Sequence, residues 1–474
     1  MIRYRRFLGR EDREAAAYTS SLGRDEWLAP YIVRVMAAHV VALADNNVVP
    51  REKLSCTASV LLKLLSSEPY SVVVEAAPDA EDFFEALEAY LYKLCGEDAG
   101  YIPIGRSRND QVSASLILAV RSLVVEVLRE LIGLRRSLIT KAREHRGIVI
   151  PVFTHLQVAQ AAWASDYLLS YEEAFSDAWR SLSSALRMLN KNPLGSGPAA
   201  GTMVGFRRRS WRGLLCFERD FTEPYYATSS RLLILLAVAQ TAVLMVELSR
   251  LAEDLVVFSS QGYGVFELPD ELVATSSIMP HKRNPVAAEV LRARAGGTIG
   301  DLAAALSMYK GLPYGYNLDL QEINDRLRAV LETTLTSVRV ASRMIKGLRI
   351  SRERAARLLQ GSVYWGQELS ESLALRTGKP FREAYFSVAA ALKEDSWRPG
   401  TNTSRLLDEA GINPDKPDAL VRARSGEPDM RITAAEERLA ADEEELARIE
   451  EMLRGCEEEL VERLREISGR GEAA

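Results

Sequence analysis

The sequence predicts an all-α protein built around several long helices, and three observations lead to this fold class. Proline is absent from long stretches, for example between Pro103 and Pro151 and between Pro313 and Pro380. Proline breaks helix interiors, so such gaps leave room for long helices. Apolar residues within the gaps recur at three- and four-residue steps, which is the helical period. No segment shows a strong strand pattern, and no short-period repeat is evident.

Five segments combine the proline gap with the helical period, namely 113–146, 159–189, 227–259, 285–309 and 319–348. Several exceed the usual length of a globular helix. Some are apolar around more than one face, as in LLILLAVAQTAVLMV at 232–246. A helix that is apolar all round must be surrounded by partners. We therefore expect a bundle shared between subunits, with a large monomeric helical protein as the alternative.

The predicted helices divide the chain into three parts. Residues 1–107 contain shorter helical patterns broken by prolines, and they predict a small N-terminal helical domain. Residues 108–354 hold the long helices and predict the central bundle. Residues 355–474 carry new turn signals and predict a C-terminal helical domain. Within the last part, the charged amphipathic segment 434–467 predicts a terminal helix covering its own domain, and a coiled coil is the other interpretation.

Composition narrows the class of protein. The 474 residues include 60 Lys and Arg against 65 Asp and Glu, and a net charge of −5 argues against a nucleic-acid-binding surface. Four scattered cysteines predict neither a disulfide framework nor a zinc site. The N-terminus shows no signal-peptide core. The apolar run 232–246 is short for a bilayer crossing and predicts a buried helix. These features favour a cytoplasmic protein.

Polar strings between the long helices are the candidate sites. Residues 105–110, GRSRND, offer two arginines and an amide that can bind carboxylates, although a helix cap with solvated arginines would look the same. His155, in THLQ before the second long helix, suits acid–base chemistry near neutral pH, but a lone histidine is more often structural. Ser196 stands in the glycine-rich turn LGSGP, which a tight connection would also explain.

The strongest local signal is the string TSSIMPHKRNP at 275–285. It packs hydroxyls, two cations and an amide between two helices, and Pro285 is suited to open the second helix. A mobile catalytic loop would have this composition. A last polar cluster, YNLDLQE at 316–322, opens the fifth long helix.

In this order, the strings resemble the fumarase/aspartase superfamily of fumarate-releasing lyases. The loop at 275–285 is typical of the whole superfamily. GRSRNDQV at 105–112, THLQ at 154–157, PLGSGPAAGT at 193–202 and YNLDLQE at 316–322 are similar to argininosuccinate lyases in particular. The resemblance runs from about residue 15 to residue 440. It implies three helical domains, the middle one a long five-helix bundle, and a homotetramer with a twenty-helix core. Each active site would be shared between subunits, with no metal or organic cofactor.

The resemblance also assigns roles in β-elimination of argininosuccinate to arginine and fumarate, a step in arginine biosynthesis. Ser276 is the base, and His155 is its partner acid, oriented by Glu289. Lys282 and Asn284 face the carboxylate whose charge grows during the reaction. The remaining substrate contacts are divided between the two ends of the substrate. The fumarate side falls to Arg108, Asn109 and Thr154, and the arginine side to Ser21, Tyr316 and Gln321.

This chain departs from the family on the arginine side. Asn324 stands where a lysine is usual, and Pro103 and Ile104 replace a His-Thr pair. The departures leave open a lyase acting on another succinyl-amine, such as adenylosuccinate. A non-catalytic use of the same scaffold is a further alternative, since folds outlive functions.

Overall fold

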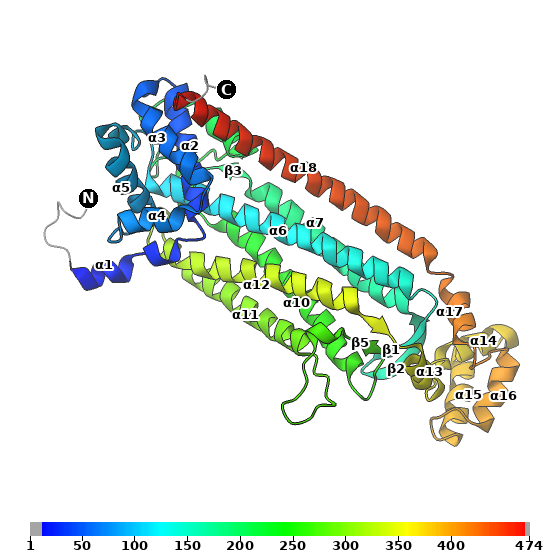
Figure 1. Ribbon diagram of the computed structural model, residues 1–474. Coiled ribbons are helices and arrows are strands. Elements are labelled where there is room, and N and C mark those ends of the chain that lie inside the picture. Colours follow the sequence, from blue (N-terminus) through cyan, green and yellow to red (C-terminus); the bar gives the residue numbers. More distant parts are fainter. Residues whose placement is uncertain (1–11, 470–474) are drawn as a thin grey trace.

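The structure, a computed structural model, describes residues 12–469 (Figure 1). Short helices form its N-terminal end: α1 Arg13–Thr19, α2 Ala29–Asp45, α3 Arg51–Leu65, α4 Pro69–Ala76 and α5 Phe83–Cys95. The middle of the chain contains α6 Arg108–Glu144, α7 Ala164–Leu189, α8 Arg209–Leu214, α9 Pro224–Ser229, α10 Leu232–Ser259, α11 Val286–Tyr309 and α12 Asp319–Gly347. The remaining helices are α13 Arg352–Gln360, α14 Gly366–Thr377, α15 Phe381–Glu394, α16 Thr401–Ala410, α17 Pro417–Ser425 and α18 Asp429–Ile467.

The prediction of an all-α fold with five long helices is confirmed. These helices, α6, α7, α10, α11 and α12, run side by side as one elongated bundle (Figure 1). Contacts join α6 to α7 and α12, and α10 to α7, α11 and α12. Leu128, Leu331 and Leu248 are among the fully buried core residues that three of them contribute. At a rise of about 1.5 Å per residue, α6 is about 55 Å long, so the bundle separates its two ends widely.

The prediction that the second long helix starts near residue 159 was wrong. Strands β1 Val149–Thr154 and β2 Gln157–Trp163 form an antiparallel hairpin, and α7 begins only at Ala164. Four two-residue strands complete the sheet content: β3 Lys191–Asn192, β4 Arg219–Asp220, β5 Phe266–Glu267 and β6 Arg349–Ile350. Strand β2 is rich in alanine, which has a low propensity for strands, so the sequence did not predict it. Pairing with β1 in the folded chain overrides this propensity.

The last helix also differs from its prediction. Instead of covering a C-terminal domain, α18 returns along the bundle to the N-terminal end of the molecule (Figure 1). It packs against α6 and α7 and then against α2, α3 and α8. Its apolar stripe, which includes Leu439, Leu446, Leu460 and Leu464, is buried by these contacts. Charged residues separate these leucines in the sequence, so the pattern predicted an amphipathic helix. The pattern could not predict which helices the apolar stripe packs against.

The cysteines were expected to be unpaired, and the structure corrects this. Cys56 is bonded to Cys95, and Cys216 is bonded to Cys456, so no free cysteine remains among residues 12–469. The first bond joins α3 to the end of α5. The second ties α18 to the segment that follows α8. Helices α2, α3 and α5 lie at the N-terminal end of the molecule (Figure 1), and α8 packs against α2, so both bonds belong to that end.

The apolar run 232–246 lies within α10, which begins five residues later than the helix expected at 227–259 and ends at the same residue. Helix α10 has 28 residues, and both α10 and α6 are long and apolar enough to cross a membrane by length and composition. In α6, 72% of the most apolar window is buried inside the chain, whereas in α10 only 50% is. Val243 on α10 and Ile299 on α11 are among the large apolar side chains that a single chain leaves exposed.

Candidate active site

The residues predicted to form the site fall into two groups at opposite ends of the bundle (Figure 1). The N-terminal group lies where α6 and α12 begin. It contains Ser21, Arg108, Asn109, Tyr316 and Gln321. The loop group lies where α7 and α11 begin. It contains Thr154, His155, Ser276, Lys282, Asn284 and Glu289.

The string GRSRND forms the N-terminus of α6. Ser107 is its N-cap, and the Asp110 carboxylate accepts from the Ser107 backbone N–H at 3.0 Å, which completes a capping box. Both arginines form ion pairs. The Arg106 guanidinium forms an ion pair of 2.7 Å with Glu88, both nearly buried, and Arg108 lies 3.2 Å from Asp82. The cap fixes the position of Arg108 and Asn109 at the first turn of the helix.

Asp110 also connects this helix to the glycine-rich turn. Its Oδ2 accepts from the backbone N–H groups of Gly195 and Gly197, at 3.2 and 2.9 Å. Burial raises the pKa of Asp110 to about 6, while these hydrogen bonds oppose the rise. Gly197 has φ +57°, and an added Cβ would lie 2.4 Å from the Gly201 carbonyl oxygen, so the turn requires glycine there. Ser196 is consequently held beside Asn109, whose amide donates to the Pro198 carbonyl at 2.9 Å.

Ser21 lies against a buried carboxyl group that sequence reasoning missed. Its hydroxyl donates to Asp25 Oδ2 at 2.9 Å, and the Phe83 N–H donates to the same oxygen at 3.0 Å. Burial raises the pKa of Asp25 to about 7, and the neighbouring Asp82 adds to the rise. A serine and a carboxylic acid four residues apart before a helix were the available signal. Asp25 can therefore exchange a proton near neutral pH.

Charges of both signs surround Tyr316. Burial raises the pKa of its phenol, the buried Arg231 opposes this shift, and Asp82 and Arg108 act on it in opposite directions. Burial also raises the pKa of Asp82, and Arg108 counteracts it. Asp82 is the N-cap of α5 and accepts from the Glu85 N–H, so a capping signal could have located it. This end of the molecule can bind a polar ligand that carries both charges.

Helix α12 supplies the other side of the N-terminal group. The Gln321 amide donates to the Thr19 carbonyl at 3.2 Å, which links α12 to the segment containing Ser21. Arg24 adds ion pairs to Glu322 and Asp325 on the same helix. Asn324 is buried, and its Oδ1 has no hydrogen-bond partner within the described part of the chain. A buried carbonyl oxygen without a donor is unfavourable, so a donor from a ligand would stabilise it.

At the other end, the predicted helix start at His155 is the tip of the β1–β2 hairpin. His155 and Leu156 have φ of 55° and 56°, which is the pattern of a type I′ turn. Residues other than glycine rarely adopt this conformation, and strained backbone often marks functional sites. Thr154 and His155 are exposed, and a cavity of about 390 Å³ opens beside His155. The hairpin therefore projects a titratable side chain into open space.

The signature string forms a loop between β5 and α11. Ala274 and Asn284 pair through backbone hydrogen bonds of 2.9 and 2.8 Å, which close its base. Between them, Ser276 Oγ accepts only the Ile278 N–H, at 3.4 Å, and Lys282 has no ion pair among residues 12–469. Arg283 is turned away to Asp270 and the Leu268 carbonyl. The loop has a fixed base and a weakly held tip, so it is suited to close over a ligand.

Glu289 was expected to orient His155, but no hydrogen bond or ion pair joins them within residues 12–469. Glu289 is exposed in the first turn of α11, and His155 is exposed at the hairpin tip. No contact joins the loop group to the N-terminal group either, because the length of the bundle separates them. Within one chain the two groups therefore remain apart.

Comparisons with known proteins identify the family of the chain. The family model described as "Lyase" matches residues 5–300. The argininosuccinate lyase of Pyrococcus furiosus is 36% identical over 387 residues, covering 82% of this chain and 83% of its own. The argininosuccinate lyase of Sulfurisphaera tokodaii is 36% identical over 412 residues, covering 87% of this chain and 88% of its own.

Solved structures share the fold. An EDDS lyase crystallised with formate superposes with a TM-score of 0.83 at 24% identity, covering 94% of this chain and 93% of its own. A class II fumarase from Schistosoma mansoni superposes with a TM-score of 0.68 at 17% identity, covering 82% of this chain and 90% of its own. The helical bundle is therefore common to this chain and to both enzymes.

Proposed function

Because the chain belongs to the argininosuccinate lyase family, we propose that it cleaves argininosuccinate to L-arginine and fumarate by reversible β-elimination. The observation that carries this proposal is the similarity to argininosuccinate lyases along more than four fifths of the chain. The chain also retains the residues that the chemistry requires, namely Ser276, Lys282, Asn284, His155 and Glu289.

The difficult step is removal of a proton from the carbon next to a carboxylate. We assign Ser276 as the base that takes this proton. The electron pair left behind is delocalised into the carboxylate, and the resulting dianion requires nearby cations and donors. Lys282 and Asn284 fit this role because both stand on the loop that carries Ser276, and Lys282 forms no ion pair with any residue among 12–469. Loop closure brings Lys282 near enough to favour the serine alkoxide.

The electron pair then forms the carbon–carbon double bond of fumarate, and the carbon–nitrogen bond breaks. His155 gives a proton to the departing guanidino nitrogen. Its exposed position at a strained hairpin tip supports this role, since the imidazole can reach a substrate held by another chain. Glu289 of a neighbouring copy would orient the imidazole, in the manner of other acid–histidine pairs.

Substrate positioning belongs to the N-terminal group. Arg108 and Asn109 bind the fumarate-side carboxylates together with Thr154 from a neighbouring chain. Ser21, Tyr316 and Gln321 bind the arginine end. Asp25 and Asp82 support the assignment because they place buried carboxyl groups where a cationic arginine would lie.

A homotetramer would complete each site. The exposed apolar faces of α10 and α11 support this, since a large apolar surface on a soluble chain marks an interface. We propose that the tetramer acts in the cytoplasm, without a cofactor. Sedimentation of the purified protein would test the assembly, and fractionation of cells would test the compartment.

The direct test is fumarate release by the purified protein, given argininosuccinate and adenylosuccinate in parallel. We expect fumarate from argininosuccinate alone. Fumarate from adenylosuccinate alone, or from neither substrate, would contradict the proposal. Ser276→Ala is the control, because it keeps the fold and removes the base.

A further inference from the structure

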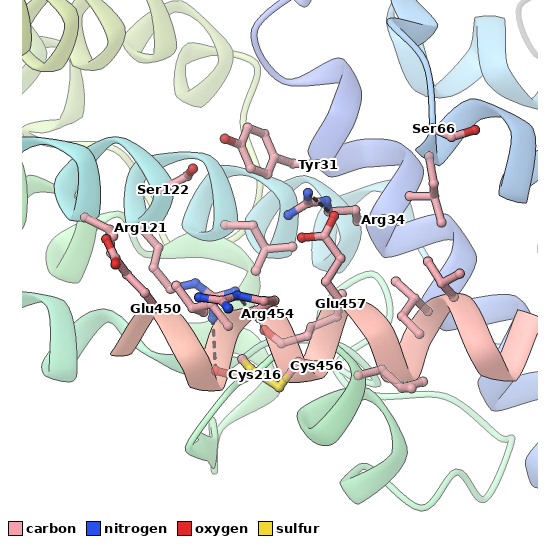
Figure 2. Close-up of a pocket in the computed structure, with 18 of the residues that line it drawn as sticks. Tyr31, Arg34, Ser66, Arg121, Ser122, Cys216, Glu450, Arg454, Cys456 and Glu457 are labelled. Atoms are coloured by element: carbon pink, nitrogen blue, oxygen red, sulfur yellow. Dashed lines mark hydrogen bonds and ion pairs between the residues drawn. A yellow bond between two sulfur atoms is a disulfide. The ribbon is translucent and has the colours of Figure 1, made fainter. Parts of the chain in front are cut away.

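A second cavity lies away from every residue assigned above. It has a volume of about 750 Å³ and is bounded by α2, α3, α6, α18 and the segment after α8 (Figure 2). None of its lining residues belongs to the N-terminal group or the loop group. The Cys216–Cys456 disulfide forms part of its wall and holds α18 in place there. Its volume is in the range of small-molecule sites.

The charges around this cavity are unbalanced. Its cationic side chains are Arg34, Lys63, Arg121, Arg129, Arg454 and Arg465, whereas its carboxylates are Glu126, Glu450 and Glu457. The carboxylates are already engaged. Arg34 pairs with Glu457 at 2.6 Å, Arg129 pairs with Glu450 at 2.7 Å, and Glu126 lies 3.6 Å from Arg339 outside the cavity. Within residues 12–469, Arg454 and Arg465 have no ion pair, and neither has the buried Arg121.

Arg121 is best understood beside Arg135, which lies fourteen residues further along the same helix. Both are buried. Arg135 is neutralised twice, by Glu172 of α7 at 2.9 Å and by Asp442 of α18 at 2.7 Å. Because α18 runs antiparallel to α6, the residue fourteen positions after Asp442 is the one that comes level with Arg121, and it is Cys456.

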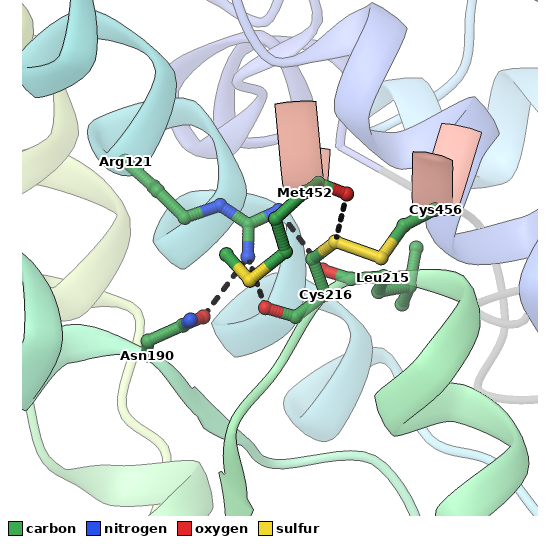
Figure 3. The surroundings of a disulfide bond; sticks show 6 residues. All are labelled: Arg121, Asn190, Leu215, Cys216, Met452 and Cys456. Atoms are coloured by element: carbon green, nitrogen blue, oxygen red, sulfur yellow. Dashed lines mark hydrogen bonds between the residues drawn. A yellow bond between two sulfur atoms is a disulfide. The ribbon is translucent and has the colours of Figure 1, made fainter. Parts of the chain in front are cut away.

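The contacts of Arg121 show what replaces the missing carboxylates. Its guanidinium donates to Asn190 Oδ1 at 2.9 Å and to the carbonyls of Cys216 and Leu215 at 3.0 and 2.9 Å (Figure 3). All three acceptors are neutral. Burial lowers the pKa of Arg121 to about 10, and the nearby Arg34 lowers it further, while Glu218 opposes the shift without forming an ion pair. A buried cation without a counter-charge is unfavourable, and an anion in the cavity would relieve it.

We propose that this cavity binds a small phosphorylated anion, at a site separate from the active site. Arg454 and Arg465 offer forked donors that match phosphate oxygens, and Lys63 adds a third mobile cation. The cavity has more cations than one phosphate group needs, so we expect the ligand to carry more than one phosphate group. Apolar residues of the same wall, including Leu62, Leu453 and Leu460, together with the Tyr31 ring, leave room for an organic group on the phosphates.

The experiment is calorimetric titration of the full-length oxidised protein with inorganic pyrophosphate and, separately, with ATP. We expect both to bind. Equal affinities would mean that the phosphates alone are recognised, and tighter binding of ATP would mean that the organic group contributes. Arg454→Ala and Arg465→Ala should each weaken binding about tenfold or more, because each removes charge-assisted hydrogen bonds. Both residues are exposed, so neither change should disturb folding.

Arg448→Ala is the matched control. Arg448 is an exposed arginine of α18 outside the cavity, paired with Glu444 at 3.6 Å. Its loss removes the same charge from the same helix and should change affinity by no more than about twofold. The proposal is overturned if neither anion binds at millimolar concentration, or if Arg448→Ala weakens binding as much as Arg454→Ala. Fumarate release should be the same in all three variants without added anion.

Discussion

The two ends of the bundle carry the two halves of the candidate site, and they are built differently. At the N-terminal end, Ser21 and Asp110 form buried hydrogen bonds and Arg108 pairs with Asp82, with two disulfides nearby. At the loop end, His155 is exposed on a strained turn, and Ser276 is weakly held. The N-terminal group is therefore held in a fixed arrangement within one chain, whereas the loop group is open. In the proposed mechanism, neighbouring chains and loop closure would complete the surroundings of the loop group.

Ser276→Ala should produce the largest effect on activity. A positioned base contributes roughly a hundredfold to ten-thousandfold, so kcat should fall by about that factor while the N-terminal group stays intact. Affinity for argininosuccinate should remain nearly unchanged, because positioning rests with the N-terminal group. Equilibrium binding and single-turnover fumarate release would measure both quantities. Near-normal turnover would remove Ser276 from the mechanism.

The disulfides should account for the largest difference in stability. In the chain-entropy account, closing a loop of 240 residues stabilises by roughly 5 kcal/mol and a loop of 39 by roughly 4 kcal/mol. The double variant C216S/C456S should therefore lower Tm more than C56S/C95S. A strong reductant should lower the Tm of the wild type toward that of a variant that lacks both disulfides. Calorimetry would measure this. An unchanged Tm under reductant, with free thiols demonstrated, would show that the bonds do not stabilise the N-terminal end.

Leu156→Gly should stabilise the loop end. A left-handed conformation costs a residue with a Cβ about 1–2 kcal/mol, and the flexibility of glycine in the unfolded chain returns part of this, leaving a gain of about 0.5–1 kcal/mol. Leu156→Ala is the matched control, since it shortens the same exposed side chain but keeps the strain. Denaturant unfolding would compare them. Equal stabilities of the two variants would show that the turn is not strained.

Asp25→Asn should have the most specific effect, a change in how stability depends on pH. Burial raises the folded-state pKa of Asp25 to about 7 from an unfolded value near 3.8. The wild type therefore meets almost no penalty at about pH 3 and below, where the carboxyl is mostly protonated in both states, and the penalty grows as the pH rises to about 7. The Tm of the variant should come close to that of the wild type at about pH 3 and exceed it at pH 8. A difference that does not change with pH would contradict the raised pKa.

The same comparison shows what sequence can predict. The long helices were predictable because their period and proline gaps are local properties. The hairpin at 149–163 was not, since His155-Leu156 lacks the Asn-Gly or Asp-Gly signal of a type I′ turn and β2 is rich in alanine. The cysteine pairs are 39 and 240 residues apart, so only the path of α18 brings the second pair together.

The candidate site divides in the same way. The string at 275–285 stood out from composition alone, because so dense a polar string between helices is improbable by chance. The string at 105–110 did not, since a helix cap explains it equally well, and only the family resemblance favoured it. Asp25 was missed because its raised pKa results from burial beside Ser21, and the sequence does not show which carboxyl groups are buried. That the site residues occupy opposite ends of the bundle is a consequence of helix length and direction, which no single string contains.

The central claim is that each active site combines the N-terminal group of one chain with the loop group of others. Mixing two inactive variants, Arg108→Gln and His155→Asn, after reversible dissociation tests it most directly. Hybrid oligomers would contain some sites free of both substitutions, so argininosuccinate cleavage should return on mixing and be absent from either variant alone. Mass analysis would show whether mixed oligomers form. If they form and activity does not return, the N-terminal group of one chain does not meet the loop group of another, and the account is wrong.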